Sequence, residues 1–129
     1  MTRAKGNIRQ FTPPRQLMAE ERELLEYLLN TPFTGNSELQ QQSQSVGVSE
    51  ECVCGCRTII LSVDSTASEP APVTNNVPVQ ADAIDDDGVP VSVIVHVHRG
   101  YLSELEALRA DSKPLHAFPK LNALDVYAR

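Results

Sequence analysis

The alternation of valine with other residues between positions 91 and 98 most constrains what this chain can fold into. Valine occupies every second position, and serine, isoleucine and histidine lie between the valines. Successive side chains of a β-strand point to opposite faces, so this pattern predicts one face against a core and one face turned outward. Residues 57–63 and 77–83 are also rich in alternating apolar positions, and the DDDG sequence at 85–88 is typical of a turn. The second half of the chain therefore favours an antiparallel sheet.

The first part of the chain has helical periodicity instead. Residues 17–29 place five leucines on one stripe of a helix: Leu17, Leu24, Leu25, Leu28 and Leu29. The TPP sequence at 12–14 predicts the start of this helix, because a hydroxyl can cap it and proline suits the first turn. The NTP sequence at 30–32 predicts its end.

A second, short helix is expected over residues 37–45, as a glutamine-rich surface helix held by two apolar contacts. Residues 65–76 combine proline, serine and asparagine without periodicity, and we expect a mobile loop. Residues 101–109 fit a strand or a helix. The two-residue link Arg99-Gly100 favours a strand paired in a hairpin, with a helix over 101–110 as the alternative. The tail is expected to be extended at an edge of the sheet.

Helices followed by strands indicate an α+β fold, with N-terminal helices packed on an antiparallel meander of about four to five strands. A length of 129 residues fits one domain. We expect a flexible basic arm over residues 1–12 and a single α+β domain over 13–129. No apolar run approaches the roughly 18–20 residues of a membrane span.

Charge is divided unevenly along the chain. Residues 1–15 carry four basic residues and no acidic one, and the remainder carries 7 basic and 17 acidic residues, a net charge of −10. Because phosphate contacts need clustered lysine and arginine, the acidic body argues against nucleic acid as a partner. The first residues lack the apolar segment of a secretory signal, and three cysteines are an odd number that does not favour a disulfide framework. We therefore expect a cytoplasmic location, and the oligomeric state stays open.

The segment Cys52-Val53-Cys54-Gly55-Cys56 is the candidate site. Three thiols within five residues could select zinc, copper(I) or an iron–sulfur cluster. On a flat strand the outer thiols would lie about 13 Å apart, at roughly 3.3 Å per residue. Thiolates on one zinc lie about 4 Å apart, so the segment would have to bend to bind it.

A tetrahedral zinc also needs a fourth ligand, which His96 or His98 could supply, with His116 more remote. Two alternatives to this metal site stay open. The cysteines could be small buried hydrophobic residues in a tight bend. A reactive thiol is the other alternative, with Cys56 activated by His96.

Other motifs give no complete site. Aligning Gly88 with the glycine of a calcium loop puts Ala83 and Ile94 where oxygen ligands are required, so that motif fails. Glu104 and Glu106 would share a face of a strand, where paired carboxylates could do acid–base chemistry, although a solvated face explains them equally simply. The sequence has no P-loop, GxGxxG, HExxH or GxSxG motif, so no catalytic residue is predicted.

Four segments together resemble a family of short, uncharacterised bacterial proteins. They are the sequences EERELL, FTGNSEL, CVCGC and GYLSELE at residues 20–25, 33–39, 52–56 and 100–106. The resemblance covers most of residues 17–121. It implies a bacterial, cytoplasmic, single-domain protein, and it carries over no activity and no catalytic residue.

The sequence therefore favours a non-enzymatic domain that binds another protein. The acidic body, the lack of a complete catalytic motif and a sheet face that one helix cannot cover all point that way. The first alternative is a zinc-binding protein that uses Cys52, Cys54, Cys56 and His96. The second is a thiol-dependent enzyme.

Overall fold

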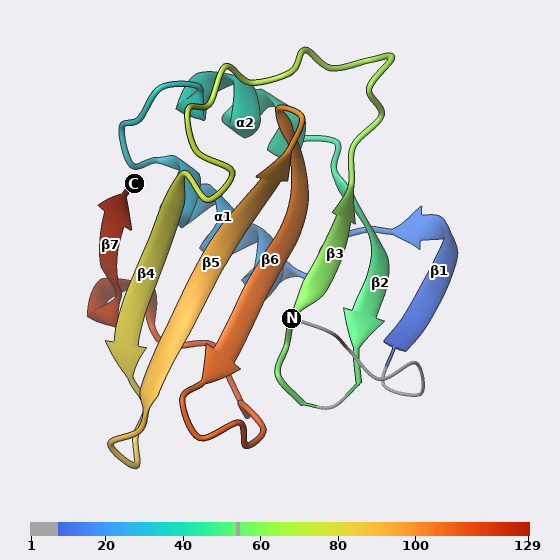
Figure 1. The fold of residues 1–129 in the computed structure, drawn as a ribbon. Coiled ribbons are helices and arrows are strands. Elements are labelled where there is room, and N and C mark those ends of the chain that lie inside the picture. The colour runs from blue at the N-terminus through green and yellow to red at the C-terminus, as the bar shows by residue number, and fades with distance from the viewer. Residues whose placement is uncertain (1–7, 54) are drawn as a thin grey trace.

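A computed structural model describes residues 8–53 and 55–129, which form two α-helices and a seven-stranded antiparallel sheet (Figure 1). In chain order the elements are β1 (Ile8–Arg15), α1 (Ala19–Leu29), α2 (Asn36–Ser43), β2 (Gly47–Cys52), β3 (Ile59–Ser62), β4 (Val79–Ile84), β5 (Pro90–His98), β6 (Tyr101–Arg109), the 3-10 turn η2 (Leu121–Ala123) and β7 (Asp125–Ala128). The fold is α+β, as expected, but richer in strands. No helix of the described residues is long and apolar enough to cross a membrane.

The strand order is β1-β2-β3-β6-β5-β4-β7. Strands β4, β5 and β6 form the expected meander, so residues 101–109 are a strand rather than a helix. The chain crosses one end of the sheet between β3 and β4, and β6 then returns to pair with β3 (Figure 1). The tail forms β7 and pairs with β4 at the edge, also as expected.

Both helices lie on one face of the sheet (Figure 1). The leucine stripe of α1 and the valine face of β5 belong to one hydrophobic core, and four leucines of α1 are at most 1% exposed. Burial of that many leucine and valine side chains is the main stabilising term of the fold. No helix among the described residues covers the opposite face, which we call the open face.

The start of the chain differs from the expectation. The flexible arm expected over 1–12 falls partly on residues 1–7, outside the described residues, and residues 8–12 belong to β1. The TPP sequence lies in β1 rather than at a helix start, and α1 begins at Ala19. Proline fits there because β1 is an edge strand, where a missing N–H removes no ladder bond from the sheet interior. With β1 and β2, the sheet has seven strands rather than four or five.

The second helix is more deeply anchored than expected. Gln42 of α2 is only 1% exposed. Its amide donates hydrogen bonds of 2.9 Å to the carbonyls of Glu69 and Gly100, and its oxygen accepts one of 3.0 Å from the N–H of Leu102. The side chain therefore joins α2 to the turn between β5 and β6.

Candidate functional site

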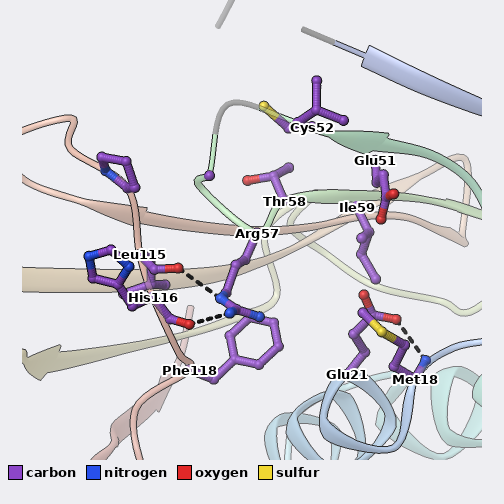
Figure 2. A pocket seen from close by; sticks show the side chains of 13 residues that line it. Met18, Glu21, Glu51, Cys52, Arg57, Thr58, Ile59, Leu115, His116 and Phe118 are labelled. Carbon is purple, nitrogen blue, oxygen red and sulfur yellow. Dashed lines mark hydrogen bonds between the residues drawn. The ribbon is translucent and has the colours of Figure 1, made fainter.

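A cavity of about 360 Å³ lies between the β2–β3 loop, the start of α1 and residues 114–118 (Figure 2). Cys52 and His116 both line it, although His116 was expected to be the more remote histidine. Arg57 extends across this cavity toward His116 and Phe118, as Figure 2 shows. The cavity is thus the place where the cysteine segment meets the C-terminal part of the chain.

Arg57 holds the two walls of this cavity together. Its Nε donates a hydrogen bond of 2.7 Å to the carbonyl of Leu115, and an Nη group donates another to the carbonyl of His116. Its guanidinium lies 5.6 Å from the centre of the Phe118 ring, a cation–π distance. Nη1 of Arg57 also lies 3.6 Å from a carboxylate oxygen of Glu20, so the guanidinium joins the β2–β3 loop both to residues 115–118 and to α1.

The carboxylate of Glu21 at the other end of the cavity is also engaged. Glu21 is 2% exposed and accepts hydrogen bonds of 2.9 and 3.1 Å from Arg15 and one of 2.8 Å from the N–H of Met18. Arg15 also bonds Glu51 at 3.1 Å. The hydrogen bond to Glu21, followed by the one to Glu51, raises the pKa of Arg15. This network caps α1 and ties it to β1 and β2.

The predicted site of Cys52, Cys54, Cys56 and His96 is only partly described. Cys52 ends β2 and Cys56 lies in the next loop, both half-buried, and Cys54 is outside the described residues. His96 lies on β5, and both β6 and β3 separate β5 from β2. Three strand spacings of roughly 4.8 Å put His96 about 14 Å or more from β2. The structure therefore does not bring His96 to Cys52, and β6 likewise separates it from the loop that holds Cys56.

His96 instead joins the two glutamates of β6. Its Nε2 lies 2.8 Å from Oε1 of Glu106, and one ligand atom from each of His96, Glu104 and Glu106 lies within 4.8 Å of the others. Glu104 is opposite His96 in the ladder, and a bulge follows between His96 and Val97. We call these three residues the His96 cluster. The sequence placed Glu104 and Glu106 on one face of a strand, but their meeting with His96 depends on the register of the β5–β6 hairpin.

The open face around the His96 cluster is acidic. Five carboxylates occupy outward positions of strands β2 to β7: Glu50, Asp82, Glu104, Glu106 and Asp125. The same six strands contain a single arginine and no lysine, and that arginine, Arg109, is buried opposite Val91 on the core side. Apolar residues lie among the carboxylates, and Ile84 is 64% exposed.

Arg109 forms a second charged cluster. Its guanidinium contacts Asp85 at 2.6 Å, Asp87 at 2.8 Å and Asp111 at 2.9 Å. These hydrogen bonds, first that of Asp111, raise the pKa of Arg109. In return Arg109 lowers the pKa of Asp87 and, with the N–H of Lys113, lowers that of Asp111 to about 2. Residues 85–88 thus form a turn, as expected, and Asp85 and Asp87 of this turn bind Arg109.

Comparison with known proteins identifies a family. A family model described as a domain of unknown function, DUF6984, matches residues 14–119. No curated protein and no solved structure matches the chain. The matched range includes the cysteine segment, the His96 cluster and the Arg109 cluster.

Proposed function

The chain belongs to the DUF6984 family, a family of unknown function, and from that premise we propose that it is a binding protein whose open face docks a positively charged partner protein. The observation that carries the proposal is the charge of this face. Strands β2 to β7 offer five outward carboxylates, and the one arginine of these six strands is buried on the other side. Such a surface attracts a basic partner protein and repels acidic proteins.

The apolar content of the open face favours a protein as that partner. Ile84 is exposed, and Ile94 and Leu108 are half-buried between the carboxylates. Apolar groups within a charged surface are typical of protein interfaces. Nucleic acid would meet the carboxylates with its phosphates and be repelled. A bacterial cytoplasm is part of the proposal, supported by the resemblance of four segments and by the odd number of cysteines.

The first step of the test is to identify what contacts each face. A photo-crosslinking amino acid replaces Ser92 on the open face and, in a control, Tyr27 on the exposed side of α1. We expect crosslinked partners at position 92 that do not appear at position 27. Identical crosslinks at both positions would contradict a face-specific interaction.

The second step measures the affinity of the purified partner by calorimetry. The double substitution Glu50→Gln and Asp125→Asn should weaken binding on the order of tenfold and reduce its salt dependence, because two attractive charges are lost. The matched control is Glu23→Gln with Glu69→Gln, which removes two exposed carboxylates that do not lie on the open face. Equal losses in the two double variants would show that net charge, not this face, governs binding.

A further inference from the structure

We propose that His96, Glu104 and Glu106 bind one divalent transition-metal ion of the zinc class on the open face. This site differs from the cysteine site expected from the sequence, and it goes beyond the docking of a partner. One imidazole nitrogen and two carboxylate oxygens already lie within 4.8 Å of one another. Ligands about 2.0–2.2 Å from a zinc ion lie roughly 3–4 Å apart, so small side-chain rotations complete the site.

The donor set selects the kind of metal. An imidazole nitrogen with two carboxylates suits zinc and neighbouring divalent ions of the first transition row. Calcium and magnesium prefer all-oxygen sites with more ligands, and copper(I) prefers thiolates. Three protein ligands leave at least one coordination position for water or for a group of another molecule.

The framework of the site is rigid. Strands β5 and β6 pair from Val91 and Arg109 to His98 and Tyr101, so the backbones below the ligands are fixed. The side chains of His96 and Glu106 are 32% and 12% exposed, which reduces competition from water while leaving the ion an entry path. Ligands fixed before the metal arrives lose little conformational entropy when it binds.

Electrostatics favour the same conclusion. The cluster gathers two carboxylates around an imidazole, on strands whose only lysine or arginine lies on the opposite face. A divalent ion between the carboxylates would replace the 2.8 Å contact of His96 with Glu106 by two metal–ligand bonds and would offset the repulsion between the carboxylates.

The test is calorimetric titration of the untagged, metal-free chain with zinc chloride. We expect one zinc per chain and a loss of at least tenfold in affinity in His96→Gln and in Glu106→Gln. His98→Gln is the matched control, because His98 lies on the same strand and the same face two residues away. It should leave the affinity unchanged, and circular dichroism checks that each variant is folded.

A triple substitution of Cys52, Cys54 and Cys56 by serine separates this site from the cysteine segment. Zinc binding should persist in this variant, and cobalt(II) bound to the native chain should show no thiolate-to-cobalt charge-transfer band. Zinc that survives His96→Gln but is lost with the cysteines would overturn the proposal, as would the absence of stoichiometric binding. If the triple variant does not fold, the cobalt spectrum alone decides. Binding of the partner protein is tested separately, with the Glu50 and Asp125 variants in the presence of a chelator. Its outcome therefore does not depend on the outcome of the zinc titration.

Discussion

Strand β6 contributes to two clusters of acidic side chains that differ in one respect. At its end, Arg109 gathers three aspartates from the turn before β5 and the turn after β6. Near its middle, Glu104 and Glu106 meet His96 of β5. The first cluster contains its own permanent cation, and the second contains an imidazole. The number of carboxylates is similar, so it does not distinguish the roles of the two clusters.

The resident cation does distinguish them. The side chain of Arg109 is 7% exposed. Its guanidinium donates hydrogen bonds to three carboxylates from two turns and so joins those turns. Arg109 is the only lysine or arginine of β5 and β6, and it lies on the face opposite the His96 cluster. We therefore assign the Arg109 cluster to folding and propose that the His96 cluster serves binding.

The largest effect is expected from Arg109→Met. Methionine fills the buried site with an unbranched apolar side chain, but it leaves three aspartates close together without a cation. We expect the largest decrease in the urea midpoint of any substitution discussed here, measured at neutral pH. The control is Arg9→Met, which removes one exposed ion pair with Glu51 and should be nearly neutral. Similar midpoints for the two variants would argue against a structural role for the Arg109 cluster.

The second prediction concerns acid. Arg109 lowers the pKa of Asp111 from 3.8 to about 2 and also lowers that of Asp87. A folded-state pKa below the unfolded value means that this stabilisation is present above about pH 4 and is lost as the pH falls toward about 2. In Arg109→Met that loss should disappear, because protonation then relieves repulsion among the aspartates. Urea midpoints across this pH range would show it, and parallel profiles for both proteins would contradict it.

Local periodicity predicted most of the fold. The leucines of α1 and the valines of β5 identify their elements because each pattern repeats within one segment. Strand β1 was missed because proline was interpreted as a helix start, whereas an edge strand also tolerates it. The burial of Gln42 was missed because its three partners lie 27 to 60 residues away along the chain.

The candidate site was predictable only in its parts. His96, Glu104 and Glu106 each stood out in the sequence, and the hairpin that brings them together was expected. Their convergence also depends on the ladder register and on the bulge after His96, which no single residue in the sequence indicates. The expected zinc site paired His96 of β5 with Cys52 of β2, but β6 and β3 lie between these two strands.

The third prediction concerns the effect of zinc on stability through the His96 cluster. At a concentration about 100 times its Kd, zinc should raise the free energy of unfolding by about 2.7 kcal/mol, provided that it binds only the folded chain. His96→Gln should lose this increment. Arg109→Met should keep it, because the two clusters share no side chain. An increment lost in Arg109→Met and kept in His96→Gln would reverse the assignment of the two clusters.

The smallest effect on stability is expected from Glu104→Gln without metal. Glutamine keeps the shape of a half-buried side chain and removes one of two neighbouring like charges, so the free energy of unfolding should change by less than about 1 kcal/mol. The same substitution should weaken zinc binding at least tenfold, because it removes an anionic ligand. Urea unfolding in chelator and zinc calorimetry on one preparation measure both quantities. A large loss of stability without metal would mean that Glu104 supports the fold as Arg109 does, and the distinction between the two clusters would then fail.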